Sequence, residues 1–322
     1  MLLGELPMKL LVQRARILAE TRAFFASRDY LEVETPLAVP CPGLDLHLDA
    51  FQVVPTGVAA TEGASATAFE SRFLATSPEY QMKRLLAEGH GRIFQITHAF
   101  RAGEDGERHN PEFTILEFYR PHAGVEGIMR DTEQLVARVT GGFVEIGRRR
   151  IDVRPPFARI TVLEAFERWA KTKPEETLRL AEHDEERFFR LLIEDVEPRL
   201  AELDRAVFVT EYPATQASLA RRKPGVPRVA ERFELYVAGV ELCNGFGELT
   251  DEREQRARFE RDQIERRRHK KAVYPIDERF LDALARGMPE SAGNAIGFDR
   301  LVALVCGTTR IGDVMAFTDG EL

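Results

Sequence analysis

Hydrophobic side chains along this chain follow two periods, one of about 3.6 residues and one of about two residues. The helical period predicts an amphipathic helix at residues 9–28. Further helices are predicted after Ser77, a suitable N-cap, and at about 125–139, 161–171, 175–195, 251–271 and from 300 onward. The two-residue period predicts strands within 29–36, 94–101, 113–119, 207–210, 232–237, 240–249 and 293–297. These strands follow one another mostly in hairpin order, which predicts an α+β fold with an antiparallel sheet flanked by helices.

Three segments interrupt this pattern. Residues 56–67, rich in Gly, Ala, Ser and Thr, predict a surface loop between two strands. Residues 155–230 contain charged helical stretches and an Arg-, Lys- and Pro-rich loop, and we interpret them as a helical insertion. Ala238 and Gly239 predict a tight turn. We therefore expect residues 1–322 to form a single domain that carries one insertion.

Composition narrows the possible partners. The chain has 322 residues and a formal net charge of −8, so its overall charge does not favour binding to nucleic acid. Residues 266–271 form the best candidate for a local basic patch, although such a run is more often a solvated helix end. The cysteines Cys41, Cys243 and Cys306 lack metal-binding spacing and indicate reduced thiols. Because no export signal and no apolar run of membrane-spanning length is present, we expect a cytoplasmic protein without a membrane partner.

The most informative segment is residues 100–120. Arg101 ends an apolar strand, and in the strand that follows Phe113, Glu117 and Tyr119 share one face, since strand side chains alternate. A guanidinium donates paired hydrogen bonds to phosphate. A purely structural hairpin would carry apolar residues at the position of Glu117, so this pattern favours a binding surface.

Acidic residues mark a second segment, residues 232–251. Glu234 and Glu241 lie on opposite sides of a tight turn, where antiparallel pairing can bring them together as ligands for Mg²⁺, completed by phosphates and water. Asn244 and Glu248 are four residues apart and can share a strand face. An exposed acidic edge strand would explain Glu234, but it explains poorly a strand this rich in Leu, Cys, Phe and Gly.

A third segment, residues 293–301, places Arg300 at the start of an apolar helix. Cations are normally disfavoured at a helix N-terminus, so this position indicates an anionic ligand nearby. Sorting the three segments by charge gives two groups. The cationic group suits a triphosphate and contains Arg101, Arg300, His109 and Arg108. The other suits a ligand with amino groups and contains Glu79, Glu117, Glu248 and Tyr119. One pocket with both groups predicts a diamino substrate whose carboxylate reacts with ATP.

These segments resemble the class II aminoacyl-tRNA synthetase catalytic core over nearly the whole chain. Residues 29–40, 100–120 and 293–304 are similar to motifs 1, 2 and 3 of that family, in the expected order. The finer resemblance is to lysyl-tRNA synthetases, through TSPEYQMKR, HNPEFTILEFY and ELCNGFGELTD. Two features differ from that subgroup: no amino-terminal anticodon-binding barrel is expected, and Ala295 stands where lysyl-tRNA synthetases have glycine. Both features resemble the paralogous family of elongation factor P–(R)-β-lysine ligases, in which the Ala295 methyl would favour an amino group on the β carbon.

The resemblance also implies roles for single residues. Arg101 is implied as the catalytic residue at the α-phosphate. The implied substrate contacts are Ser77, Glu79, Glu117, Tyr119, Asn244, Glu248 and Ala295. The implied ATP contacts are Arg101, Gly103, Glu104, His109, Asn110, Phe113, Glu241, Leu242, Gly297 and Arg300, with Phe113 and Arg300 around adenine. Glu234 and Glu241 are the implied Mg²⁺ ligands. Motif 2 usually has Glu where Gly103 stands, so the contact to the adenine edge would come from Glu104 or from backbone.

The activity implied is ATP-dependent ligation. (R)-β-lysine, or less well lysine, would form an adenylate and then be transferred to a lysine of elongation factor P by a homodimeric enzyme that does not use tRNA. Two alternatives stay open at this point. One is a stand-alone lysyl-tRNA synthetase-like enzyme that charges tRNA, against which the acidic balance argues. The other is a catalytically silent, regulatory paralogue, against which the charged site residues argue.

Overall fold

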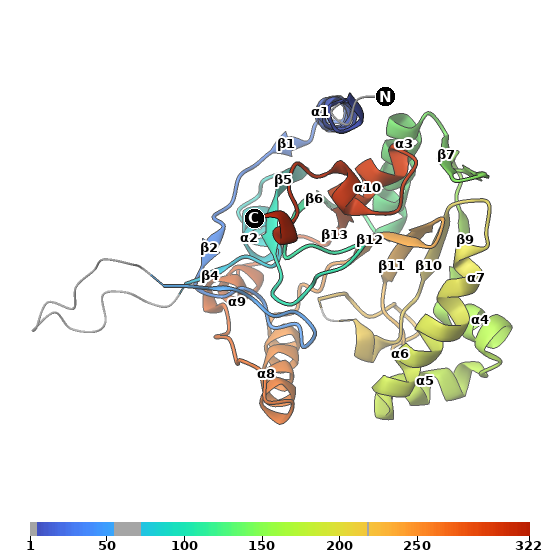
Figure 1. The fold of residues 1–322 in the computed structure, drawn as a ribbon. Coiled ribbons are helices and arrows are strands. Elements are labelled where there is room, and N and C mark those ends of the chain that lie inside the picture. Colours follow the sequence, from blue (N-terminus) through green and yellow to red (C-terminus); the bar gives the residue numbers. More distant parts are fainter. Residues whose placement is uncertain (1–4, 55–71, 218) are drawn as a thin grey trace, which may run out of the picture.

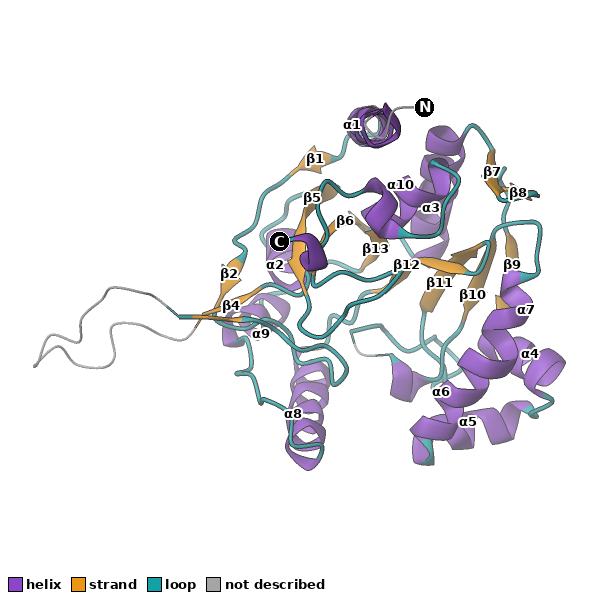
Figure 2. Cartoon of the chain, in the orientation of Figure 1, coloured by secondary structure: helices purple, strands orange, loops and turns teal. Residues whose placement is uncertain are grey.

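The structure of the chain, a computed structural model, describes residues 5–54, 72–217 and 219–322. At its centre lies an eight-stranded sheet in the order β1-β5-β6-β13-β12-β11-β10-β9 (Figure 1). Its strands are β1 (Leu31–Glu32), β5 (Ile93–Phe100), β6 (Glu112–Pro121), β9 (Ala158–Thr161), β10 (Val207–Thr210), β11 (Arg232–Val237), β12 (Val240–Gly247) and β13 (Ser291–Gly297). Helices pack around this sheet, so the predicted α+β class is confirmed (Figure 2).

The direction of the strands differs from the prediction at both edges of the sheet. Neighbouring strands run antiparallel from β5 through β6, β13, β12 and β11 to β10. The outer pairs β1–β5 and β9–β10 are parallel. A parallel pair needs a long crossover connection, which the hairpin order of the inner strands does not reveal. The tight turn between β11 and β12 is as predicted, with φ values of 52° at Ala238 and 76° at Gly239.

One face of the sheet is covered by helices α1 (Glu5–Ala26), α3 (Val125–Thr140) and α10 (Phe298–Val305). Aromatic rings fill this layer, and the Phe25 ring stacks on Phe94 with centroids 4.6 Å apart. Because side chains alternate along β6, Phe118 joins this core while Tyr119 joins a second core on the opposite face.

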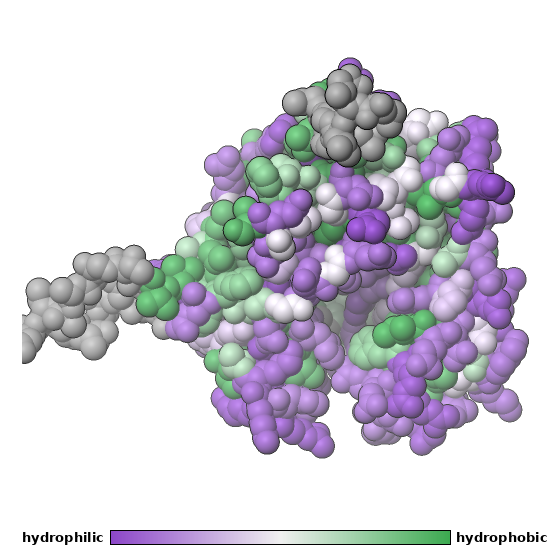
Figure 3. All heavy atoms as spheres, in the orientation of Figure 1, coloured by the Kyte–Doolittle hydropathy of each residue, from purple (hydrophilic) through white to green (hydrophobic). Residues whose placement is uncertain are grey.

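The second core lies under helices α2 (Glu79–Ala87), α8 (Glu252–Arg268) and α9 (Glu278–Ala285). Tyr80 of α2 stacks on Phe280 of α9 with ring centroids 4.8 Å apart. This contact fixes the start of α2 above the sheet. The surface over α8 and over the helices α5 (Pro174–His183) and α6 (Glu185–Leu191) is mostly hydrophilic, with a hollow between them (Figure 3).

The predicted insertion contains α4 (Val162–Ala165), α5, α6 and α7 (Glu197–Ala201). Short π-helical stretches continue α4 as far as Ala170 and join α6 to α7. These helices share a hydrophobic cluster in which Phe166 stacks on Phe188, with ring centroids 4.8 Å apart. Strands β9 and β10 flank this region and extend the central sheet. The interpretation of residues 155–230 as an insertion stays a prediction.

Residues 29–40 depart from the predicted strand. Only β1 and β2 (Ala38–Val39) are regular there, and β2 joins β4 (Arg72–Leu74) and β3 (Gln52–Val53) in a small sheet. The hairpin of β7 (Phe143–Ile146) and β8 (Arg149–Asp152) was not predicted. The predicted loop at 56–67 lies outside the described residues.

The basic run at 266–271 is partly structural. Arg266 is fully buried, donates hydrogen bonds to the carbonyls of Asp45 and Leu48, and pairs with Asp49 at 2.6 Å. Lys271 also pairs with Asp49, at 2.9 Å. The start of the run therefore fixes the loop of residues 41–50. In the part of the chain that the structure describes, no helix has the length and apolar character needed to cross a membrane.

Candidate active site

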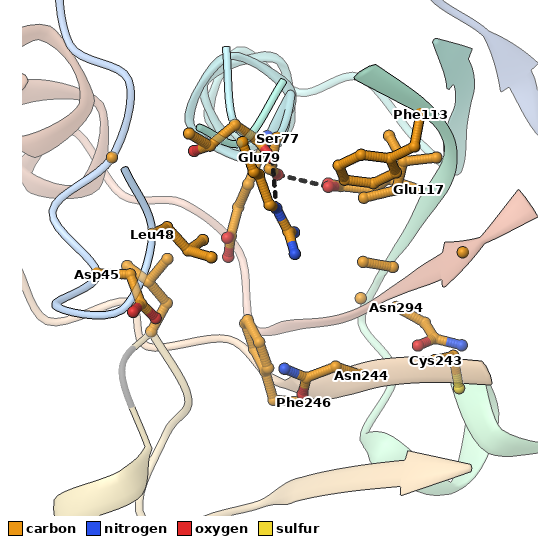
Figure 4. A pocket seen from close by; sticks show the side chains of 18 of the residues that line it. Asp45, Leu48, Ser77, Glu79, Phe113, Glu117, Cys243, Asn244, Phe246 and Asn294 are labelled. Atoms are coloured by element: carbon orange, nitrogen blue, oxygen red, sulfur yellow. Dashed lines mark hydrogen bonds between the residues drawn. The ribbon is translucent and has the colours of Figure 1, made fainter. Parts of the chain in front are cut away.

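A cavity lies over the middle strands of the central sheet, β6, β13 and β12. Figure 4 shows Glu79 at the start of α2, Glu117 on β6, and Asn244 and Phe246 on β12 arranged around one space, with Asp45 on the 41–50 loop at its side. These side chains come from four separate parts of the sequence. The cavity is therefore a product of the sheet topology.

Nearly all residues predicted for the site line this cavity. They are Ser77, Glu79, Arg101, Glu104, His109, Asn110, Phe113, Glu117, Tyr119, Glu241, Leu242, Asn244, Glu248, Ala295, Gly297 and Arg300. Gly103 and Glu234 do not line it. The structure thus brings the predicted residues together, while their contacts with ligands stay predictions.

Arg101 occupies one end of the cavity. Its Nε donates a hydrogen bond of 3.3 Å to the Thr76 carbonyl, and its guanidinium carbon lies 4.9 Å from the centroid of the Phe113 ring. The ion pair with Glu104 is long, at 3.8 Å. Because this contact is long, the Arg101 guanidinium has N–H donors available for an anionic group in the cavity.

Arg300 and His109 lie at the same end. Arg300 Nη2 is 2.8 Å from His109 Nε2, and an arginine can only donate, so the imidazole accepts with its unprotonated nitrogen. Burial and the nearby charge of Arg300 lower the pKa of His109 below its ordinary value. His109 is therefore neutral at pH 7 and adds a polar group to a cationic end without adding charge.

The loop between β5 and β6 is held by its own contacts. Arg108 donates a 2.7 Å hydrogen bond to the carbonyl of Gly239. The Asn110 side chain donates to the Glu112 carbonyl at 2.7 Å and accepts from the Asp319 amide at 3.0 Å. Gly103 has φ of 81°, a conformation that side chains disfavour. Gly103 therefore turns the chain, and Glu104 is the carboxylate of this loop that reaches the cavity.

Glu117 lies at the opposite end of the cavity and is almost fully buried. It accepts hydrogen bonds from Ser77 Oγ at 2.5 Å and from the Tyr119 hydroxyl at 2.9 Å. Burial, together with the charge of Glu79, raises the pKa of Glu117 to about 7. Such a carboxylate favours a cationic ligand, because a positive charge beside it offsets the cost of burying its negative charge.

Two further carboxylates flank a buried lysine at this end. Lys83 Nζ lies 2.6 Å from Glu79 Oε1 and 2.5 Å from Glu248 Oε2. Burial alone lowers the pKa of Lys83, but the charges of Glu248 and Glu79 outweigh it and raise that pKa. Burial raises the pKa of Glu248 to about 8, against the opposing charge of Lys83. Among the described residues, Glu248 Oε1 has no hydrogen-bond donor.

Pairing in the sheet sets the floor between the two ends. Ala295 on β13 pairs with Glu117 on β6 and with Asn244 on β12, so these three side chains form a row across the strands. Gly293 lies in the next row, between Tyr119 and Phe246. Small residues on β13 therefore leave room above the middle of the sheet.

The two predicted metal ligands lie in different surroundings. Burial and the charge of Glu234 raise the pKa of Glu241 to about 7. Arg300 donates to the Glu241 main-chain carbonyl at 2.8 Å but approaches the Glu241 carboxylate only to 3.5 Å, so this carboxylate suits a cation. Glu234 pairs with Arg232 at 2.6 Å and accepts hydrogen bonds from Tyr212 at 2.5 Å and Tyr236 at 2.9 Å. Both carboxylate oxygens of Glu234 already accept hydrogen bonds from these partners, and the negative charge of Glu234 affects the pKa of Glu241. Within residues 5–54, 72–217 and 219–322, no group of three or more His, Cys, Asp or Glu side chains could hold a metal alone.

Comparison with known proteins agrees with this geometry. The model for tRNA synthetases class II (D, K and N) matches residues 5–320. The chain belongs to this family. It is 43% identical to elongation factor P–(R)-beta-lysine ligase of Erwinia tasmaniensis over 96% of the chain and 94% of the relative. Identity to the ligase of the same name from Salmonella dublin is 41%, again over 96% and 94% of the two chains. The resemblance predicted from the sequence is therefore confirmed.

The class II motifs correspond to clear structural parts of the site. Motif 2 supplies the end of β5, the loop that follows it and β6, and motif 3 supplies most of β13 and helix α10. Helix α1, which precedes motif 1, is tied to both, because Arg14 on α1 pairs with Asp299 at 2.6 Å and Asp299 accepts from the Thr114 amide at 2.7 Å. Sequence analysis missed this link, since its members are far apart in the chain.

Sequence analysis also missed several residues that line or shape the cavity. They are Lys83, Thr76, Gly293, Phe246 and the loop residues 41–48. The signal for Lys83 was its place four residues after Glu79 on a helix, where side chains meet. Nothing in the local sequence marks the loop, because a buried arginine of α8 places it.

Proposed function

We propose that this chain is an ATP-dependent, AMP-forming ligase that activates (R)-β-lysine, or less efficiently lysine, and transfers it to a lysine of elongation factor P. The carrying observation is a single cavity with Arg101 and Arg300 at one end and Glu79, Glu117 and Glu248 at the other. A triphosphate fits the first end, and a diamine fits the second. The names of the relatives at 41–43% identity support this acceptor and this amino acid.

In the first step, the substrate carboxylate attacks the α-phosphorus of ATP. The bond between the α-phosphorus and the bridging oxygen to the β-phosphate breaks, which gives an aminoacyl-adenylate and pyrophosphate. Arg101 is proposed to bind the α-phosphate and to stabilise the charge that builds up there. Phe113 and Arg300 are proposed to hold adenine. Positioning supplies much of the remaining rate acceleration, because both reactants lie on rigid strands.

In the second step, a neutral lysine amine of elongation factor P attacks the carbonyl of the mixed anhydride. An amide forms and AMP leaves with the bonding electrons. The amine then loses its extra proton, and the adenylate phosphate is the proposed acceptor.

Mg²⁺ is part of the proposal, and Glu241 is its better-placed ligand. Glu241 lines the cavity and is loosely paired, whereas Glu234 would exchange contacts with Arg232 before binding a metal directly. When bound there, Mg²⁺ would offset negative charge on the phosphates of ATP. Phosphate and water oxygens would complete the coordination.

We further propose a homodimer formed through α1 and the segment that follows it. Leu11, Val12, Leu31 and Leu37 are between 37% and 56% exposed in the single chain, which is unusual for large apolar residues grouped on neighbouring elements. A two-fold contact would bury them.

The test is amino-acid-dependent exchange of pyrophosphate into ATP, measured with (R)-β-lysine and with each α-lysine isomer. Mass spectrometry of elongation factor P after incubation with ATP and the same amino acids tests the transfer. We expect the strongest exchange with (R)-β-lysine and one modified lysine. Efficient charging of total tRNA would instead favour the synthetase-like alternative. Absence of exchange with every isomer would favour a regulatory paralogue.

A further inference from the structure

Lys83 is a fully buried lysine with no role in the proposed reaction. It lies in the second turn of α2, with its side chain 0% exposed, between the carboxylates of Glu79 and Glu248. Its ammonium lies 5.0 Å from the centroid of the Phe246 ring. All three of these partners line the cavity. Lys83 therefore lies behind the side chains that would contact the amino acid, on their buried side.

A purely structural role explains this lysine poorly. A buried ion pair is a weak source of stability, because removing both charges from water costs about as much as their attraction returns. Methionine would fill the same space beside Phe246 without that cost. A lysine here is thus better explained by the charge that it brings to the two carboxylates.

Counting charges shows what Lys83 does to this end of the cavity. Glu79, Glu117 and Glu248 bring three negative charges when ionised, and Lys83 brings one positive charge. Two net negative charges remain. They match a substrate that brings two ammonium groups, whereas three unbalanced carboxylates would not.

The geometry adds a positioning effect. Lys83 holds one oxygen of each flanking carboxylate, Glu79 Oε1 and Glu248 Oε2. Glu248 Oε1 stays without a donor among the described residues and lies 2.6 Å from the point where a Cβ on Gly293 would stand. That oxygen therefore faces the floor of the cavity, ready to accept a hydrogen bond from a ligand.

We propose that Lys83 is a positioning and specificity-determining residue, which orients Glu79 and Glu248 and sets the charge of this end so that it selects substrates with two ammonium groups. The inference rests on the proposed function. A substrate with a single ammonium leaves one buried negative charge unpaired, and an unpaired buried charge is costly.

The experiment compares (R)-β-lysine with 6-aminohexanoate, which carries only one ammonium group, in pyrophosphate exchange. In Lys83→Met, we expect KM for (R)-β-lysine to rise about tenfold or more while KM for ATP changes by less than about twofold, because only the amino-acid end is altered. Lys83→Arg keeps the positive charge, and we expect it to retain most of the preference for (R)-β-lysine over 6-aminohexanoate. Lys223→Met is the matched control, because it breaks a lysine–glutamate pair with Glu211 outside the cavity.

A double variant separates charge balance from structural support. Glu79→Gln leaves one net negative charge, so we expect the preference for the diamine to fall. Adding Lys83→Met to that variant restores two net charges, and we expect the preference to rise again. If Lys83 only held α2 in place, adding Lys83→Met would not raise the preference again. If Lys83→Met alone fails to fold, the comparison of Glu79→Gln with the double variant still tests the proposal.

Three results would overturn the proposal. They are an unchanged KM for (R)-β-lysine in folded Lys83→Met, a double variant that discriminates no better than Glu79→Gln, and loss of the preference in folded Lys83→Arg. Absence of exchange in the unmodified protein with every lysine isomer would instead overturn the proposed function, so the two failures are distinguishable.

Discussion

Gly293 offers a direct test of the floor of the cavity, through the substitution Gly293→Ala. A Cβ at this position would lie 2.4 Å from Cδ1 and Cε1 of Tyr119 and 2.6 Å from Glu248 Oε1. Ordinary contacts begin at 3.4 Å, so the methyl requires a shift of about 1 Å. Neither neighbour moves easily, because Tyr119 is 4% exposed and Glu248 is fully buried.

The size of the effect follows from that crowding. Overpacking of a rigid site costs about 1–3 kcal/mol, which corresponds to a fall in Tm of roughly 1.5–4.5 °C for a chain of this size. A displacement of about 1 Å at binding groups can reduce turnover by about a hundredfold. We therefore expect KM for (R)-β-lysine to rise about tenfold or more, with KM for ATP nearly unchanged.

The assay is pyrophosphate exchange with the two substrates varied separately, together with thermal unfolding. Gly91→Ala is the matched control, since its added methyl would meet nothing within 4 Å. Wild-type KM for (R)-β-lysine in Gly293→Ala would refute the assignment of Tyr119 and Glu248 to the amino-acid end. An equal rise in both KM values would refute the separation of the two ends.

Four further predictions concern charge and assembly. Arg101→Ala should lower kcat of exchange by about a hundredfold or more with little change in Tm, because the guanidinium acts on charge that builds up at phosphate; an unchanged kcat contradicts its role. The raised pKa values of Glu117, about 7, and Glu248, about 8, mean that both carboxyls are neutral below those values, so KM for (R)-β-lysine should fall as pH rises through this range. Because the pKa values of Glu117 and Glu248 are raised in the folded chain, both carboxyls hold protons there that they have lost in the unfolded chain. Tm without substrate should therefore fall as pH rises from 4.5 to about 8. Bound substrate should remove this dependence of Tm on pH. Val12→Asp should halve the mass seen by light scattering, and a monomeric unmodified protein would contradict the dimer.

Local patterns predicted the inner strands and the longer helices well. Strands β10 and β11 have the predicted bounds, 207–210 and 232–237, because β-branched and aromatic residues are concentrated there. The helix predicted at 125–139 ends one residue later, at Thr140, before the left-handed Gly141. Signals of this kind depend only on neighbours in the sequence.

Elements that depend on distant partners were predicted less well. Residues 29–36 alternate like a strand, yet only β1 is regular there, and its pairing with β5 joins residues about sixty apart. Ser77 was predicted as an N-cap, but α2 begins after Pro78, and the Ser77 hydroxyl accepts from the Glu79 amide while donating to Glu117. A site residue took the place of a capping residue.

The same distinction applies to the site. Charged residues on predicted strands could be assigned to a cavity from their faces alone, and the structure brings them together. Glu234 was placed correctly near Glu241, but its pairing with Arg232 depends on a side chain two residues away on the same strand, which faces the same side. Local sequence does not show which of two acidic residues remains loosely paired.

The cavity exists because of the strand that carries no charge. Strand β13 reads Ser-Ala-Gly-Asn-Ala-Ile-Gly and lies between β6, which carries Glu117, and β12, which leads to Glu248. Its small residues Gly293 and Ala295 form the floor, so the charged side chains on either side face one open space rather than each other. Larger side chains on β13 would fill that space and leave the carboxylates buried without room for a ligand, which is costly for an ionised group. The specificity of this site therefore depends as much on the missing side chains of β13 as on the charged residues beside it.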